Sequence, residues 1–294
     1  MNMSIINSPL RYPGGKAILS SLFAEILTNN SLRDGIYIEP FCGGAGAALS
    51  LLYTEYVSSI VLNDIDPCVY AFWKTILYEK EELIRKIQET DITIEEWRRQ
   101  RDIYRNNNRH SQLNVAFAFY FLNRCNRSGI VVNGGPIGGL KQNGKWKINA
   151  RFNKKELIRR IEKISMYKER IEIHNMDAVE FIRMIVNNNE KMDDVLIYLD
   201  PPYYSKGSKL YLNYYCHEDH ANLAEFIQRQ KRIRWIMTYD DVPMIKKLYR
   251  KSHTTTLCLG YSIYRRRKGS EILIYPKKLI MPSEYNAEKK DKKI

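Results

Sequence analysis

Short apolar runs alternate with helical segments along this chain, and that alternation constrains the fold more than any other feature of the sequence. Six runs of strand-forming residues, rich in Ile, Val, Leu or Tyr, read GIYIEPF, SSIVLND, RIEIHN, DVLIYLD, RIRWIMTY and SEILIYP. The spacers carry apolar residues at helical intervals, as in KKELIRRIEKI with Leu157, Ile158, Ile161 and Ile164. Strands and helices in alternation predict a mostly parallel sheet with helices on both faces.

The alternation is interrupted over residues 70–168, where no convincing long strand occurs. This region contains the helical pieces YAFWKTILYEKEELIRKI and QLNVAFAFYFLNRC, and a loop that is dense in Gly, Asn and Lys. We therefore expect an α/β core made of residues 1–69 and 169–280, an inserted helical domain at 70–168, and a basic tail at 281–294.

The charge balance indicates a polyanionic partner. The net charge is +14 and the isoelectric point is about 9.4, which favours nucleic acid, although part of the charge lies in the tail EKKDKKI and a solvated basic surface is the alternative. The five cysteines form no CxxC pair, which argues against a zinc site or a disulfide framework, so we expect no metal. No segment approaches the about 18 apolar residues of a membrane span, and the N-terminus does not resemble a signal peptide. We expect a cytoplasmic protein without membrane contact.

A glycine-rich loop follows the first strand in YIEPFCGGAGAALSLLY, with Gly43, Gly44 and Gly46 before an alanine-rich helix. The next strand ends at Asp64, 18 residues after Gly46, where nucleotide-binding α/β folds place an acid on the ribose hydroxyls. The loop lacks GxGxxG spacing, and GxxxxGK[ST] is absent, so a nucleoside cofactor without a phosphate fits better than a dinucleotide. A plain tight turn remains an alternative, and a nicotinamide oxidoreductase has only this loop in its favour.

A carboxylate and aromatic rings meet at one strand end in VLIYLDPPYYSKG. Asp200 and the carbonyl of the following proline, which lacks an N–H, form a double acceptor for an amine with two hydrogens. Tyr203 or Tyr204 can stack on a flat ring. The stretch favours an exocyclic amine on an aromatic base over a plain Asp–Pro turn. RYPGGK, at residues 11–16, could bind a carboxylate or phosphate before a helix, or could be an ordinary Pro–Gly turn.

Seven segments, in matching order, resemble the motifs of the Dam-type (D12 class, alpha group) DNA adenine-N6 methyltransferases. They are RYPGGK, EPFCGGAGAALS, NDID, FLNRCNRSG, ARFN, LDPPYY and SEILIYP. The resemblance implies a Rossmann-like α/β S-adenosylmethionine-dependent methyltransferase fold with a mostly helical target-recognition insertion. It implies methyl transfer from S-adenosylmethionine to N6 of a flipped adenine in double-stranded DNA. We also expect a monomer that acts in a restriction–modification or phage modification system. A cognate restriction endonuclease would then be a partner.

The resemblance also implies site residues. In methyl transfer, the Asp200 carboxylate and the Pro201 carbonyl would grip the target amine beside Pro202, with Tyr203 stacked on the base. Asp64 would hold the ribose and Asp177 the adenine amine of the cofactor. The full cofactor set is Tyr12, Gly15, Lys16, Glu39, Phe41, Gly43, Gly46, Asp64, Ile65, Asp177 and Asp200. Tyr204 has no assigned role.

The DNA contacts are expected mainly in the insertion and in the basic loop SIYRRRKG. The residues are Arg11, Asn123, Arg124, Asn126, Arg127, Ser128, Lys141, Lys145, Lys147, Arg265, Arg266 and Arg267. For any one of them, a solvated basic loop is the alternative. Relatives that methylate GATC usually carry an arginine shortly after the loop glycine, where this chain reads GIVVNGG, so we expect another target. Cytosine N4, an RNA substrate and a non-catalytic DNA-binding protein stay open as alternatives.

Overall fold

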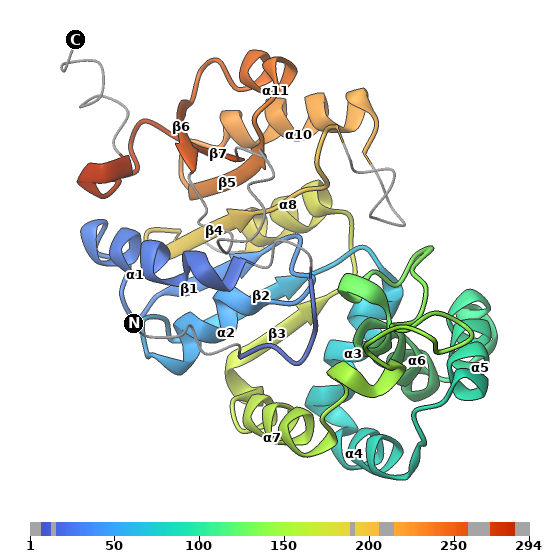
Figure 1. The fold of residues 1–294 in the computed structure, drawn as a ribbon. Helices are drawn as coiled ribbons and strands as arrows, with labels where there is room; N and C mark the ends of the chain where they lie inside the picture. Colours follow the sequence, from blue (N-terminus) through green and yellow to red (C-terminus); the bar gives the residue numbers. More distant parts are fainter. Residues whose placement is uncertain (1–6, 13–15, 189–191, 206–214, 258–270, 286–294) are drawn as a thin grey trace.

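The computed structural model describes residues 7–12, 16–188, 192–205, 215–257 and 271–285 of the 294-residue chain. Within these residues, seven strands form one sheet in the order β3-β2-β1-β4-β5-β7-β6 (Figure 1). β7 runs antiparallel to both of its neighbours, and the other neighbouring pairs are parallel. The strands are β1 (Ile36–Glu39), β2 (Ser59–Asn63), β3 (Ile171–His174), β4 (Val195–Leu199), β5 (Arg234–Asp240), β6 (His253–Leu257) and β7 (Glu271–Tyr275).

The six strands expected from the sequence are all present, and the expectation of a mostly parallel sheet is confirmed. β6 was missed. Its sequence, HTTTL, contains three threonines and a single strongly apolar residue. β6 lies at the edge of the sheet and pairs only with β7, so it does not need the apolar run that marks a strand buried on both sides.

Helices cover both faces of the sheet. Successive residues of a strand point to opposite faces, and in β4 Leu196 and Tyr198 join one buried cluster while Ile197 and Leu199 join the other. The first face is covered by α1 (Ser20–Asn29) and α2 (Gly46–Tyr53), and the second by α8 (Ala178–Asn188), α10 (His217–Arg229) and α11 (Pro243–Leu248). This arrangement confirms the doubly wound, Rossmann-like α/β fold.

The chain between β2 and β3 is helical, as expected, and gathers beside β3 in the lower part of Figure 1. The helices are α3 (Pro67–Tyr78), α4 (Lys80–Glu89), α5 (Ile94–Arg105), α6 (Gln112–Cys125) and α7 (Lys154–Ser165). Short 3-10 turns complete the described elements: η1 (Lys16–Leu19), η2 (Asn107–Arg109), η3 (Arg127–Gly129), η4 (Ile148–Arg151), η5 (Lys168–Arg170) and η6 (Ser283–Tyr285). Among the helices of the described ranges, none has the length and apolar character needed to cross a bilayer.

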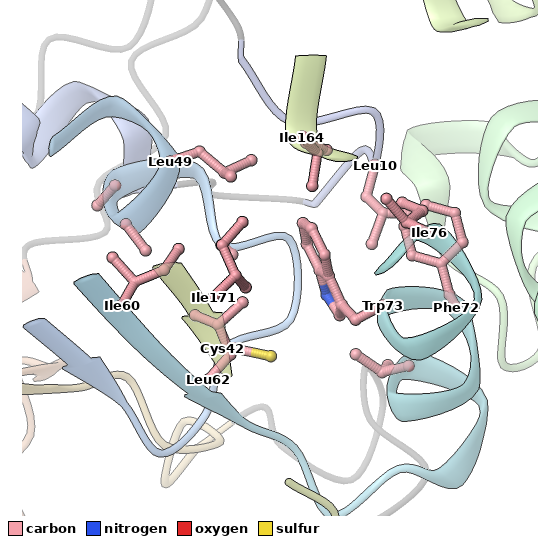
Figure 2. Close-up of a cluster of buried hydrophobic side chains, with 14 of the residues drawn as sticks. Leu10, Cys42, Leu49, Ile60, Leu62, Phe72, Trp73, Ile76, Ile164 and Ile171 are labelled. Carbon is pink, nitrogen blue, oxygen red and sulfur yellow. The ribbon is translucent and has the colours of Figure 1, made fainter. Parts of the chain in front are cut away.

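Trp73 joins the insertion to the sheet. Figure 2 shows its ring between Cys42 and Ile171 on the sheet side and Phe72 on α3. The indole is fully buried, and its Nε1 donates a hydrogen bond to the carbonyl of Gly43 at 2.9 Å. The inserted helices therefore share one continuous hydrophobic core with the first face of the sheet. Through Trp73 they also contact the glycine loop.

Candidate functional site

The carboxyl ends of β1, β2 and β4 border a cavity of about 740 Å³, which is where ligands bind in open parallel sheets. Several residues singled out from the sequence line this cavity. They are Arg11, Tyr12, Lys16, Glu39, Phe41, Gly43, Gly46, Asp64, Ile65, Arg124, Ser128, Asp200 and Pro202. The glycine loop, its distant acid and the Asp–Pro–Pro–Tyr turn, which are far apart in sequence, thus meet at one site.

The glycine loop forms the tight floor of the cavity. Gly43 has φ of +42°, and a Cβ there would lie 2.9 Å from Cε1 of Tyr12. At Gly46, the first residue of α2, a Cβ would lie 3.2 Å from the Cβ of Ala17. Any larger residue at Gly43 would suffer backbone strain and would also displace the Tyr12 ring. The two glycines therefore let Tyr12 and η1 pack directly on the loop.

Asp64 is bound to the glycine loop. Its Oδ2 accepts a hydrogen bond from the Gly43 amide at 2.9 Å, and its Oδ1 accepts one from the Asp66 amide at 3.0 Å. Burial, with a smaller contribution from the charge of Asp66, raises the pKa of Asp64 to about 7. A carboxylate has about four acceptor positions, so two amides leave capacity for hydroxyl donors from a ligand.

Asn63 and Glu39 fix the strand ends around Asp64. The fully buried Asn63 donates from Nδ2 to the carbonyls of Pro40 and Met176, and its Oδ1 accepts from the Met176 amide. This side chain ties together the segments that follow β1 and β3. Glu39, which is 4% exposed, accepts from the Ala48 amide at 3.2 Å, and burial raises its pKa to about 8.

A buried charge network surrounds the carboxylate of Asp200. The Lys16 Nζ donates to Glu271 Oε2 at 2.6 Å and to the Tyr203 hydroxyl at 3.0 Å, and it lies 3.6 Å from Asp200 Oδ1. The Tyr203 hydroxyl in turn donates to Glu271 Oε1. Lys16 and Glu271 are 8% and 7% exposed, so one buried cation lies between a buried carboxylate, Glu271, and the half-buried carboxylate of Asp200.

Asp200 is held from the sheet side by Thr238. The Thr238 hydroxyl donates to Asp200 Oδ1 at 2.6 Å, and Tyr198 hydrogen-bonds to the same hydroxyl at 2.8 Å. Burial raises the pKa of Asp200, whereas Lys16 and Thr238 lower it and Glu271 raises it. The contacts from Thr238 and Lys16 both involve Oδ1.

The turn after Asp200 is anchored to the end of β5. Oδ1 of Asp240 accepts from the Tyr204 amide, and Oδ2 accepts from the amide and hydroxyl of Ser205. The Tyr204 ring packs against His220 with centroids 5.0 Å apart. Tyr204, which had no assigned role, therefore packs against His220 and the hydrophobic core of the second face. Pro201 and Tyr203 lie in the turn but do not line the cavity.

Glu271, Thr238 and Asp240 were missed by the sequence analysis. Glu271 is the first residue of β7 and pairs with Asp240, the last residue of β5. Because β7 is antiparallel, its first residue lies at the edge where the parallel strands end. The position of Glu271 directly before the apolar run of SEILIYP indicated a residue at a strand end. If that strand were parallel to the others, however, Glu271 would lie at the opposite edge of the sheet.

Two predicted DNA contacts are corrected by their burial. Asn123 is 2% exposed, its Oδ1 accepts from the Arg11 amide, and its Nδ2 donates to the carbonyls of Arg11 and Gly129. Asn126 is fully buried, its Oδ1 accepts from Trp97 Nε1, and its Nδ2 donates to the Ile130 carbonyl. These amides bind the chain internally, so they position neighbouring segments and cannot read base edges.

The other predicted DNA contacts have different positions. Arg124 donates to the carbonyls of Arg151 and Pro9, and burial, together with the charges of Arg11 and Arg160, lowers its pKa to about 10. Arg11 donates to the Asn126 carbonyl at 3.0 Å. Both guanidinium groups and Ser128 border the cavity. Arg127 and the three predicted lysines, Lys141, Lys145 and Lys147, are exposed and lie outside it.

Asp177 is exposed and immediately precedes α8. Its Oδ1 accepts from the amides of Val179 and Glu180, and it does not line the cavity, so contact with a cofactor stays a prediction. Gly15, Arg265, Arg266 and Arg267 lie outside the described residues.

Comparison with known proteins identifies the family. A solved structure described as a conserved hypothetical protein of Streptococcus pyogenes is 11% identical, covers 84% of this chain and 88% of its own, and has a TM-score of 0.33; a likeness at that level carries no argument. No curated protein matches the chain. The family model of the D12 class N6 adenine-specific DNA methyltransferases matches residues 12–268. Because this match spans most of the chain and includes the glycine loop, Asp64 and Asp200, the protein belongs to the D12 class N6 adenine-specific DNA methyltransferase family.

Proposed function

We propose that the protein is a site-specific DNA-methyltransferase that transfers a methyl group from S-adenosylmethionine to N6 of a flipped adenine in double-stranded DNA. One observation carries the proposal: the glycine loop with Asp64 and the half-buried carboxylate of Asp200 border the same cavity. This arrangement supports the proposal, because a loop suited to a nucleoside and an acceptor suited to an amine border one cavity. The proposal includes action as a monomer in restriction–modification, beside a cognate endonuclease, or in phage DNA modification.

The residues present suit S-adenosylmethionine. Asp64 keeps acceptor capacity for ribose hydroxyls, and the absence of a side chain at Gly43 lets the Tyr12 ring pack directly on the loop beside it. Tyr12, Phe41 and Ile65 supply apolar walls. S-adenosylmethionine supplies a methyl group on a positively charged sulfur, which is already a strong electrophile. The carboxylates at the strand ends, Glu39, Asp64 and Asp200, suit a ligand that carries a positive charge. We propose that these acids and Lys16 bind S-adenosylmethionine.

Positioning of the target amine is the main task left to the protein. The Asp200 carboxylate and the Pro201 carbonyl would accept the two amine hydrogens, which localises the nitrogen lone pair and directs it away from the ring. Thr238 keeps the Asp200 carboxylate in one orientation. Flipping costs a few kcal/mol, and stacking on Tyr203 would return about 1–3 kcal/mol. Contacts to phosphates must supply the rest.

We propose that Glu271 is the positioning residue of this network. The Lys16 Nζ is 2.6 Å from Glu271 and 3.6 Å from Asp200, so Glu271 holds the ammonium group back from the acceptor that the amine needs. Its second oxygen accepts from the Tyr203 hydroxyl. One carboxylate on β7 thus sets the position of Lys16 and the orientation of the Tyr203 ring.

The DNA-contact surface is proposed on the basis of exposure and charge. Arg11, Arg124 and Ser128 border the cavity and would approach the strand that carries the flipped base. Arg127, Lys141, Lys145 and Lys147 would contact phosphates, and the segment containing Arg265, Arg266 and Arg267 remains a predicted second contact.

Nucleoside analysis tests the proposal. Unmethylated genomic DNA is incubated with the protein and S-adenosylmethionine, digested to nucleosides and analysed by mass spectrometry, with an RNA arm in parallel. We expect N6-methyladenine from DNA only, its loss in Asp200→Ala, and wild-type amounts in Asp91→Asn, which changes an exposed acid outside the site. N4-methylcytosine, methylated RNA, or equal product from wild type and Asp200→Ala would each contradict the proposal.

A further inference from the structure

A long part of the insertion contains no acidic residue. Between Asp102 and Glu156 the sequence has neither Asp nor Glu, although the whole chain has 33 acids. The basic residues in this stretch are Arg105, Arg109, Arg124, Arg127, Lys141, Lys145, Lys147, Arg151, Lys154 and Lys155. No carboxylate within the stretch can neutralise these charges locally, so it attracts a polyanion more strongly than the overall balance of the chain indicates.

Trp146 is exposed within this stretch. The side chains of Trp73, Trp97 and Trp235 are 0%, 2% and 1% exposed, whereas Trp146 is 65% exposed. All four tryptophans of the chain are therefore described, and three of them belong to the core. Trp146 lies between Lys145 and Lys147, and the nearby Leu140 is 53% exposed. A large aromatic ring left in water beside lysines is typical of a contact surface and contributes nothing to the core.

The backbone that presents Trp146 is already ordered by internal contacts. Gln142 donates from Nε2 to the carbonyls of Ile137 and Gly139 and accepts at Oε1 from the Ile148 amide at 2.8 Å. Gly138 has φ of +86°, and a Cβ there would lie 2.7 Å from the Trp146 carbonyl oxygen. The loop closes on itself through this glycine. A partner that binds the ring would therefore lose little of its binding energy to ordering the loop.

We propose that Trp146 packs its ring on a base or deoxyribose of the DNA substrate, while Lys141, Lys145 and Lys147 contact the phosphates around it. The inference rests on the proposed function, because it assumes that DNA is the substrate. Charge selects this occupant over a second copy of the chain, since two such basic loops would repel each other. Stacking on a nucleotide suits an indole because every base has an aromatic face.

Tryptophan fluorescence tests the contact directly, because the other three indoles are buried. Acrylamide quenching is measured on the full-length protein with and without a 30-base-pair duplex that it methylates. We expect a quenchable component without DNA, its protection when DNA is bound, and its absence in Trp146→Phe. Fluorescence anisotropy of a labelled duplex records binding independently of the indole signal.

Salt dependence separates stacking from charge. Trp146→Ala should weaken duplex binding roughly 10-fold, with an unchanged slope of log affinity against log salt, because an indole neutralises no phosphate. Lys145→Ala should reduce that slope by about 1. Trp146→Phe should stay within about threefold of wild type, and circular dichroism checks that each variant is folded.

The outcomes distinguish the inference from the function on which it rests. If the duplex binds and is methylated while Trp146 remains fully quenchable, or Trp146→Ala binds as wild type does, the contact is wrong and the proposed function stands. If no duplex binds under any salt condition, the proposed function fails and the contact fails with it.

Discussion

The strand-end site and the Trp146 loop both concentrate charge, but they hold it in opposite ways. At the site, Lys16, Glu271 and Asp200 are enclosed and share specific partners. On the loop, Lys141, Lys145 and Lys147 are exposed, and no acid lies near them in sequence. Water and salt screen the second set much more than the first. Substitutions at the site should therefore have large, coupled effects, and those on the loop should have small, additive and salt-dependent effects.

Burial also determines which groups can titrate near neutral pH. Desolvation disfavours the charged form of a carboxylate, and it raises the pKa of Asp64 to about 7 and of Glu39 to about 8. The site is thus expected to respond to pH and the loop to ionic strength.

The largest expected effect is at Asp200. Asp200→Asn replaces an anionic acceptor by an amide that presents a donor, and we expect kcat to fall by roughly 10²–10³-fold, as for other preorganised electrostatic groups. DNA affinity should change less than threefold, because Asp200 neutralises no phosphate. Single-turnover kinetics and duplex binding, measured on the same preparation, check both statements.

The next effect in size concerns Glu271. In Glu271→Gln, the amide can no longer accept from both the Tyr203 hydroxyl and the Lys16 ammonium group, so Lys16 should move toward Asp200. We expect kcat to fall by about 10–100-fold. The acid limb of the pH–rate profile should also move to lower pH, because Glu271 raises the pKa of Asp200 and a closer Lys16 would lower it.

A purely structural role for Glu271 predicts a different result, namely a lower melting temperature with an unshifted acid limb. Tyr203→Phe is the matched variant, because it removes one hydroxyl and leaves the Lys16–Glu271 pair intact. Tyr203→Phe should reduce kcat by less than about tenfold and should leave the acid limb of the pH–rate profile at the same pH.

Asp64 should make cofactor binding depend on pH. Ribose hydroxyls require the ionised carboxylate as acceptor, so affinity for S-adenosylmethionine should fall as pH decreases below about 7, by up to about tenfold per pH unit. Asp64→Asn should bind weakly and lack this step. Calorimetric titrations between pH 5.5 and 8.5 measure both, and an equal step in the variant would assign the titration to another group.

The same shift predicts a stability effect of defined sign. Because the pKa of Asp64 in the folded protein exceeds its ordinary value of 3.8, the folded state binds more protons between these two pH values. The contribution of Asp64 to the free energy of unfolding is therefore largest at low pH and is lost as pH rises through about 7. Without cofactor, Asp64→Asn should thus stabilise the protein more at pH 8 than at pH 5, as measured by denaturant titration.

The comparison also explains which features the sequence could reveal. The central strands are buried on both faces and therefore read as apolar runs, whereas the edge strand β6 needs no such pattern and was missed. Asp64 and Asp200 follow apolar runs and were found at the strand ends. Glu271 was missed because strand direction is a tertiary property, set by the pairing of β7 with β5. Asn123 and Asn126 were misassigned because a motif gives residue type but not burial.

The smallest expected effects are those of the exposed lysines, and they bear most directly on the contrast between the two regions. Lys145→Ala and Lys147→Ala should each weaken duplex binding by only a few-fold at physiological salt, and each should reduce the salt slope by about 1. Because both side chains are exposed and neither is paired with the other, the double variant should show the sum of the two free-energy changes within about 0.5 kcal/mol. Anisotropy titrations at four salt concentrations measure the slope and the additivity together, with the exposed Lys247→Ala on α11 as a matched control outside the acid-free stretch. A coupling free energy well above about 0.5 kcal/mol would show that the loop rearranges when DNA binds. The lysines of the loop would then act together, as the buried residues around Asp200 do, and the contrast between the two regions would be lost.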